Sequence, residues 1–119
     1  MKAIIIIDHG SRYPAANDFL LKVVERAQEL TPEVHVFGAH MELAEPTISQ
    51  VIKECVNKGV THIIAHPYML SPGRHAIRDI PNLVYEEAAK YPDINVEVTE
   101  PLGLDDGIIN VIKKRCGVN

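Results

Sequence analysis

Short apolar segments alternate with amphipathic segments along the whole chain, and the short segments are predicted strands. They cover residues 3–7, 34–39, 62–70 and 94–98. The first and third are rich in isoleucine and almost unbroken, which is typical of strands covered on both faces. In the fourth, apolar and polar residues alternate, so we predict an edge strand with one wetter face.

Two helices are predicted between the first three strands. Pro14 suits the first position of a helix, and apolar residues then follow at helical spacing: Ala16, Phe19, Leu20, Val23, Val24, Ala27 and Leu30. Pro46 is predicted to begin a second helix, which ends before Gly59. Its apolar face would comprise Ile48, Val51, Ile52, Cys55 and Val56.

The second half of the chain contains two more predicted helices. The third runs from about Pro81 to Lys90 and is capped by Asp79. Its predicted core residues are Leu83, Val84 and Ala88. The fourth follows Asp105 and Asp106, whose negative charges suit a helix N-terminus.

Four strand–helix units predict one α/β domain over residues 1–119. A four-stranded parallel sheet flanked by helices, with right-handed crossovers, fits this alternation. A flavodoxin-like strand order, 2-1-3-4, makes the two most apolar strands neighbours at the centre. Ligands of such sheets bind beyond the carboxyl ends of the strands, so residues 8–13, 40–45 and 67–79 are the candidate site segments.

Composition and charge fit an ordinary globular domain. The chain has 46% apolar and 24% charged residues and a net charge of −4. This balance gives no reason to expect nucleic acid or an anionic membrane as partner. The apolar run at residues 3–7 is too short to span a bilayer, and it ends at Asp8 rather than at a small-residue cleavage site. We therefore expect a cytoplasmic protein.

The two cysteines, Cys55 and Cys116, do not form a CxxC pair. A disulfide framework is therefore not expected. Both residues fall within helical patterns, and we predict that both are buried thiols.

Two histidines lie where strands 1 and 3 are predicted to end. His9 follows the first of these strands and His75 follows the other. If the two strands are adjacent, these side chains can meet above the edge of the sheet. Two imidazoles on a wet rim suit a borderline divalent metal such as cobalt, nickel or iron, and open positions allow the ion to be passed on. Imidazole can also accept a proton at neutral pH.

Other residues in the candidate segments have two interpretations. Gly10-Ser11 and residues 71–73 could form anion-binding loops, or they could simply turn the chain sharply after a strand. Neither matches a Walker A or dinucleotide glycine pattern. Arg12 and Arg74 could bind carboxylates, or each could pair with a nearby acidic residue.

Two of the remaining histidines are predicted to lie away from the site. His35 and His62 lie at or near strand starts, away from the carboxyl ends. His66 lies within the third strand and is predicted to be packed rather than to bind metal. The sequence leaves the roles of His40, Glu42 and His66 open.

Three motifs in this order resemble the small sirohydrochlorin chelatases, the short forms of the class II chelatases. They are DHGSR at residues 8–12, AHMELAEPTI at 39–48, and PYMLSPGRH at 67–75 with DIP at 79–81. The resemblance covers nearly the whole chain. It implies a flavodoxin-like chelatase half-domain that inserts a divalent metal into a sirohydrochlorin-type tetrapyrrole and releases two protons. Cobalt comes first among the metals, with nickel and iron as alternatives, and the metal is a substrate rather than a permanently bound cofactor.

The resemblance also implies roles for individual residues. His9 matches the proton acceptor and metal ligand, and His75 matches the second metal ligand. The residues that match tetrapyrrole contacts are Glu45, Leu70, Ser71, Pro72, Gly73, Arg74 and His75. The histidine-rich insert and the C-terminal cysteine motif of some relatives are missing here, so metal storage and an iron–sulfur centre are not expected.

The size of a tetrapyrrole predicts a homodimer. Pockets that bury a large ligand usually lie in clefts between domains. Larger class II chelatases resemble two such domains in one chain, with the site between them. Two-fold pairing would give a half-length chain the same shared cleft, with His9 and His75 of both subunits near the substrate.

Three other classes of protein share features with this sequence. A receiver-type signalling domain needs an acidic residue at the end of the third strand, where residues 65–70 contain none. A phosphohistidine phosphatase usually has arginine immediately before His-Gly, and Asp8 stands there. A non-catalytic carrier of metal or tetrapyrrole would use the same residues as a chelatase, and only turnover distinguishes the two.

Overall fold

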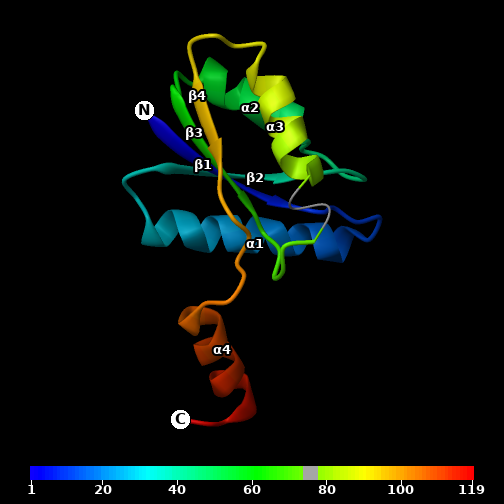
Figure 1. Cartoon of the computed structure of the whole chain (residues 1–119), viewed down its shortest axis with the longest axis vertical. Helices are drawn as coiled ribbons and strands as arrows, with labels where there is room; N and C mark the ends of the chain where they lie inside the picture. The colour runs from blue at the N-terminus through cyan, green and yellow to red at the C-terminus, as the bar shows by residue number, and fades with distance from the viewer. Residues whose placement is uncertain (74–77) are drawn as a thin grey trace.

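Four parallel strands form one sheet in the order β2-β1-β3-β4, which confirms the predicted fold class and strand order. The computed structural model describes residues 1–73 and 78–119. The elements follow each other as shown in Figure 1: β1 Lys2–Asp8, α1 Pro14–Leu30, β2 His35–His40, α2 Ile48–Asn57, β3 His62–Pro67, α3 Ile80–Ala88, β4 Asn95–Val98 and α4 Asp106–Cys116. The predicted edge strand, β4, pairs with β3 alone among the described strands.

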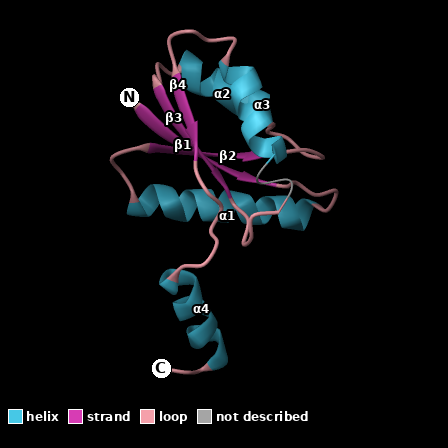
Figure 2. Cartoon of the chain, viewed as in Figure 1, coloured by secondary structure: helices cyan, strands magenta, loops and turns pink. Residues whose placement is uncertain are grey.

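The central strand β1 sends its side chains into two separate cores. Helices α2 and α3 cover one face of the sheet, and α1 covers the other (Figure 2). Ala3, Ile5 and Ile7 belong to the larger core on the α2 and α3 side. Ile6 packs with Leu20 of α1 on the opposite side. Complete burial of one such aliphatic side chain is worth about 1.5–3 kcal/mol, so β1 holds both layers together.

The second helix does not begin at Pro46, as the sequence had predicted. It begins at Ile48, because Thr47 and Gln50 form a capping box at its N-terminus. The Thr47 hydroxyl accepts from the Gln50 N–H at 3.2 Å, and the Gln50 side chain accepts from the Thr47 N–H at 2.8 Å. Pro46 instead follows a cis peptide bond, and its carbonyl accepts from the His40 N–H at 2.9 Å.

The ends of β3 and α3 also differ from prediction. β3 ends at Pro67 rather than at residue 70. Pro67 pairs with Ile7, and β1 continues for only one residue beyond Ile7, so residues 68–70 have almost no strand beside them to pair with. Asp79 does not cap α3: its backbone is already helical and its side chain makes no capping bond. The buried face of α3 carries Ile80 and Val84, while Leu83 is 39% exposed.

The last helix, α4, extends away from the rest of the molecule at one end of its long axis (Figure 1). The Asp105 carboxylate caps it by accepting from the Gly107 N–H at 2.7 Å, as the acidic pair predicted. None of its residues is buried. The helix therefore keeps its own hydrogen bonds and cap but adds no side chain to either core.

The two thiols lie in opposite environments, and the prediction that both are buried is wrong for Cys116. Cys55 is fully buried in the larger core, whereas Cys116 is exposed because α4 is not packed on the sheet. Burial raises the pKa of the Cys55 thiol to about 12, with a further rise from neighbouring Glu54.

We expect a thiol reagent at pH 8 to modify one cysteine rapidly in the folded protein. A pKa of about 12 leaves on the order of one in ten thousand of the Cys55 thiols ionised at that pH, and burial blocks access as well. Titration with a chromogenic disulfide should release one equivalent quickly and the second only on unfolding. A Cys116→Ser variant should lose the fast equivalent, and rapid release of two equivalents by the native chain would contradict this assignment.

Candidate functional site

His9 and Glu42 face each other at the carboxyl edge of the sheet. His9 directly follows β1, and Glu42 lies two residues after the end of β2. The His9 Nε2 is 3.3 Å from the Glu42 Oε1, and their side chains are 43% and 51% exposed. An imidazole nitrogen and a carboxylate oxygen thus lie together on a surface that solvent and a ligand can reach.

Backbone hydrogen bonds continue the pairing of β1 and β2 beyond the strand ends. The Met41 N–H donates to the Asp8 carbonyl at 2.9 Å, and the Glu42 N–H donates to the His9 carbonyl at 3.1 Å. Gly10 lies directly against this contact, with a φ of 91°. A Cβ at position 10 would be 1.8 Å from the carbonyl oxygen of Glu42. The close approach of the two loops therefore requires glycine at this position.

Gly10→Ala is expected to lower the free energy of unfolding by about 2–4 kcal/mol, because a positive φ and a backbone clash act together. The matched control is Gly59→Ala. Gly59 has a φ of 84°, but no heavy atom lies within 4 Å of its virtual Cβ. That change should cost about 1–3 kcal/mol, from backbone strain alone. Urea unfolding of both variants measures the difference, and equal losses would argue against the tight contact between Gly10 and Glu42.

The buried side chain of His40 and the half-buried side chain of Asp8 form a polar pair at the ends of β2 and β1. The His40 Nδ1 donates to the Asp8 Oδ1 at 2.6 Å. The His40 side chain is 3% exposed and that of Asp8 is 22% exposed. The two residues are directly opposite in the β1–β2 register. The sequence left the role of His40 open, and the structure places it beneath the His9–Glu42 pair.

An open hollow of about 350 Å³ adjoins Glu42. Its lining residues come from the loop after β2 and from the start of α3: Met41, Glu42, Asp79, Asn82 and Leu83. Leu43, on the same loop, is 53% exposed and has a φ of 68°. Met41, Leu43 and Leu83 were not predicted as site residues. Leu83 was predicted to be a core residue; it lies three residues after Ile80, beside the buried face of α3, so helical spacing alone does not reveal its 39% exposure.

The loop after β3 lies at the same edge of the sheet. Leu70, Ser71, Pro72 and Gly73 are all exposed. The loop is held from beneath, because the Leu102 and Gly103 N–H groups donate to the carbonyls of Met69 and Leu70 at 2.9 and 2.8 Å.

Arg74 and His75, the remaining predicted members of this loop, lie outside the described residues. Strands β1 and β3 are adjacent, as the meeting of His9 and His75 requires. The meeting itself stays a prediction. Glu45 is exposed near the same edge, and its Oε2 accepts from the Gln50 Nε2 at 2.9 Å.

The segment Gly10-Ser11 acts as a turn. The Ser11 N–H donates to the Asn17 Oδ1 at 3.0 Å, and the Asn17 Nδ2 donates to the Ser11 carbonyl at 2.8 Å. The Ser11 Oγ accepts from the Tyr13 N–H at 3.0 Å. These bonds hold the start of α1 and occupy the N–H that an anion-binding loop would present. Arg12 is exposed beside them.

The other described histidines lie away from the His9–Glu42 pair. His35 and His62 begin β2 and β3, at the opposite edge of the sheet. His66 is half-buried on the α1 side, and its Nδ1 is 2.8 Å from the Thr99 Oγ1. Burial lowers the His66 pKa, and a hydrogen bond to the Glu100 backbone partly opposes that shift. This environment agrees with a packed histidine.

Alanine at His35 or at His62 is expected to change catalytic turnover less than about tenfold, because neither side chain reaches the carboxyl edge. The described contact of the His62 side chain is a long ion pair with Glu97, at 3.6 Å. Steady-state rates of the two variants test the choice of edge. A loss as large as that from His9→Ala would place the site elsewhere.

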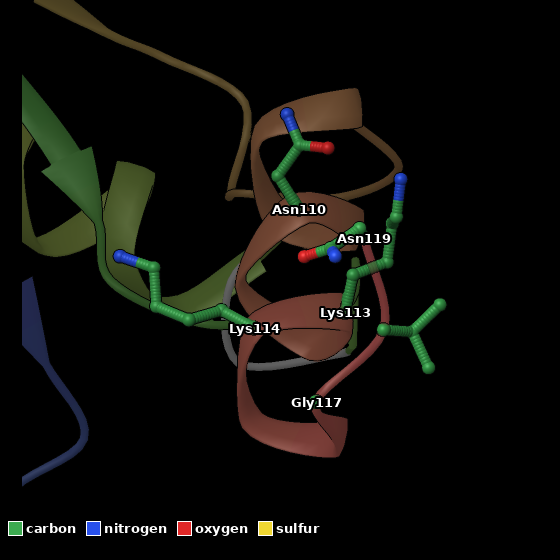
Figure 3. A pocket seen from close by; sticks show the side chains of 6 residues that line it. Asn110, Lys113, Lys114, Gly117 and Asn119 are labelled. Atoms are coloured by element: carbon green, nitrogen blue, oxygen red, sulfur yellow. The ribbon is translucent and has the colours of Figure 1, made fainter.

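A second hollow, of about 390 Å³, lies at the end of α4 and is formed by that helix and the tail after it (Figure 3). Asn110, Lys113 and Lys114 line it, far along the chain from the strand ends. Within residues 1–73 and 78–119, no group of three or more histidine, cysteine or acidic side chains is arranged to hold a metal. No described helix is long and apolar enough to cross a bilayer, and the cytoplasmic location stays a prediction.

Comparison with known proteins gives a consistent result. The family model CbiX matches residues 3–117. A chloroplastic sirohydrochlorin ferrochelatase of Arabidopsis thaliana is 39% identical over 94% of this chain and 50% of its own length. A sirohydrochlorin cobaltochelatase of Methanocaldococcus jannaschii is 31% identical over 98% of each chain.

Solved structures give the same picture. The sirohydrochlorin chelatase SirB from Bacillus subtilis subspecies spizizenii, in complex with cobalt, superimposes with a TM-score of 0.90 at 30% identity. The match covers 98% of this chain and 50% of SirB. A CbiX protein from Marinobacter aquaeolei matches over 98% of both chains, with a TM-score of 0.82 and 26% identity. The chain thus spans about half the length of some relatives and nearly all of others.

Proposed function

Because the chain belongs to the CbiX family, we propose that it inserts a divalent metal ion into a sirohydrochlorin-type tetrapyrrole. The observation that carries this proposal is the His9–Glu42 pair, 3.3 Å apart on an open rim. Relatives named as cobaltochelatases and ferrochelatases support the reaction class. We propose cobalt as the metal, with nickel and iron as the alternatives to be tested.

The His9–Glu42 pair would receive the metal and then a proton. The His9 Nε2 and the Glu42 Oε1 would bind the incoming ion from one side, and His75 would supply the second imidazole that the family resemblance implies. Both ligand types suit a borderline divalent ion, and an open coordination sphere lets pyrrole nitrogens replace them.

Insertion exchanges one divalent ion for two pyrrole N–H protons, so the charge balances. Once the ion has moved into the ring, the His9 Nε2 no longer binds it and can accept one of these protons. Solvent at the exposed rim would take the other.

The tetrapyrrole would lie against the apolar side chains beside this pair. Met41 and Leu83 line the hollow next to Glu42, Leu43 is exposed on the same loop, and these side chains would offer apolar contact to the ring. Glu45 and residues 70–75 are the contacts that the family resemblance implies for the periphery of the ring.

We also propose that the active form is a homodimer. An apolar groove of about 360 Å³ lies on the α1 side of the sheet, and its lining side chains are Ile4, Ile6, Ala27, Leu30, Thr31, Val36, Ile64, His66 and Thr99. Parallel sheets of this class normally carry helices over both faces. Helix α1 covers only part of this face, and α4 of the same chain points away (Figure 2).

Helix α4 of a second copy is the proposed occupant of this groove. Ile108, Ile109 and Ile112 follow the spacing of one helix face, and Ile109 and Ile112 are exposed. Their aliphatic side chains match the apolar lining of the groove. Relatives of about twice this length, such as SirB, support a unit with two such halves.

An absorbance assay with sirohydrochlorin and Co²⁺, Ni²⁺ or Fe²⁺ in turn tests the proposed function. We expect many equivalents of metallated product per protein chain, with cobalt the fastest. A spectral change that stops at one equivalent would identify a carrier instead of an enzyme. Rates no higher than in buffer with all three metals would overturn the proposal.

A further inference from the structure

We infer that His40 is a positioning residue, which acts through Asp8 to hold His9 against Glu42. This inference rests on the proposed function, because that proposal assigns metal binding to the His9–Glu42 pair. The described hydrogen bond of the His40 side chain is with Asp8, the residue directly before His9 in the chain. The His40 Nδ1 donates to the Asp8 carboxylate at 2.6 Å.

The burial of His40 is the first argument. It is the only polar residue among those fully buried in the described part of the chain, at 2% exposure. A buried polar side chain costs free energy unless a hydrogen bond compensates it, and the contact with Asp8 supplies that bond. An aliphatic residue such as the neighbouring Ala39 would pack in the core without needing a hydrogen bond to compensate its burial. The imidazole therefore adds orientation that packing alone would not give.

The position of the pair in the sheet is the second argument. Asp8 and His40 are the last paired residues of β1 and β2. Asp8 directly precedes His9 in the chain, and His40 precedes Glu42 by two residues. Two backbone hydrogen bonds already join the loops, from Met41 to Asp8 and from Glu42 to His9.

Those backbone bonds fix the distance between the loops but leave the side chain of Asp8 free to rotate. The bond from His40 fixes that side chain and, with it, the end of β1. The His9 backbone therefore leaves the sheet in one direction, toward the Glu42 carboxylate. Supporting hydrogen bonds behind metal-binding side chains typically change metal affinity or activity about 10–100-fold.

Two substitutions of His40 separate positioning from packing. His40→Leu keeps apolar bulk and removes the donor, whereas His40→Asn places an amide N–H near the position of the Nδ1. The full-length chain would be tested for Co²⁺ affinity by calorimetry without tetrapyrrole, and for kcat and KM with sirohydrochlorin. We expect His40→Leu to weaken Co²⁺ binding and lower kcat about 10–100-fold, with the KM for sirohydrochlorin nearly unchanged. His40→Asn should restore both values to within about fivefold of the native chain.

Gln28→Leu is the matched control. The Gln28 side chain bonds the Val34 carbonyl and the Val36 N–H at the opposite end of β2, at 2.7 and 2.9 Å. Its loss should lower the unfolding midpoint and leave Co²⁺ affinity unchanged.

A His40→Leu variant that loses stability but keeps native Co²⁺ affinity and kcat would overturn the inference. If that variant does not fold, Asp8→Asn decides instead, since it keeps the shape of the side chain and weakens the same bond. Native Co²⁺ affinity in folded Asp8→Asn would equally overturn the inference. Failure of the native chain to metallate sirohydrochlorin would refute the proposed function, while the Co²⁺ affinities would still decide the role of His40.

Discussion

Replacing His9 by alanine is expected to lower kcat for metal insertion by a factor of about 10² to 10⁴, the range typical of a lost general base. The side chain is 43% exposed and follows the strand end, so its removal should change the free energy of unfolding by no more than about 0.5 kcal/mol. Continuous absorbance assays with Co²⁺ and sirohydrochlorin measure the rate, and thermal unfolding checks the fold. Loss of the only described imidazole beside Glu42 gives this variant the largest predicted effect on catalysis.

His62→Ala is the control for His9→Ala, because it removes an imidazole of similar exposure from the opposite edge of the sheet. Glu42→Gln provides a second comparison. It keeps the size of the side chain and removes its charge, so Co²⁺ should bind more weakly while the fold is unchanged. A His9→Ala enzyme with native turnover would remove His9 from the reaction. The family resemblance predicts an equal loss for His75→Ala, at a position outside the described residues.

Ile112→Glu on α4 is expected to convert the proposed dimer to a monomer at micromolar concentration and to reduce activity accordingly. The carboxylate would be buried without a partner in the apolar groove of the second copy. That burial costs at least about 3 kcal/mol, or more than 100-fold in the dissociation constant of the dimer. Sedimentation velocity measures the mass, and activity at a series of dilutions measures the functional consequence.

Asn110→Glu is the matched control for Ile112→Glu. Asn110 lies on the same helix as Ile112 but is rotated from it by nearly half a turn around the helix axis. Asn110→Glu therefore adds the same charge on a different face. This variant should remain dimeric and active. A native chain that is monomeric with full specific activity would refute the proposed homodimer but leave the chemistry of His9 intact.

Most of the fold could be predicted because each strand is read from local pattern. The isoleucine run of β1 and the alternation in β4 depend only on adjacent residues, and both were confirmed. One error was local: the start of α2 depends on the Thr47–Gln50 capping box rather than on Pro46. The other error arose from a distant arrangement, because the exposure of Cys116 depends on where α4 lies relative to the sheet.

The candidate site could be predicted only in part, for the same reason. His9 was identified from its position after an apolar strand and from a motif. Its partner Glu42 was seen in the sequence but not assigned, because the contact depends on the register between two strands whose paired residues are 32 positions apart. The same register brings His40 to Asp8 and Gly10 to the carbonyl of Glu42.

If α4 docks on a second copy, as proposed, the thermal stability of this part of the chain should depend on protein concentration. An isolated helix of 11 residues is marginal in water, since nucleation is costly and few backbone bonds offset it. If docking on a second copy supplies the missing stabilisation, mass action governs how much of the helix is formed. Dilution would then melt α4 before it disturbs the two cores around β1. Association and the folding of the last helix would be one coupled equilibrium, and the unfolding midpoint would rise with the logarithm of the chain concentration.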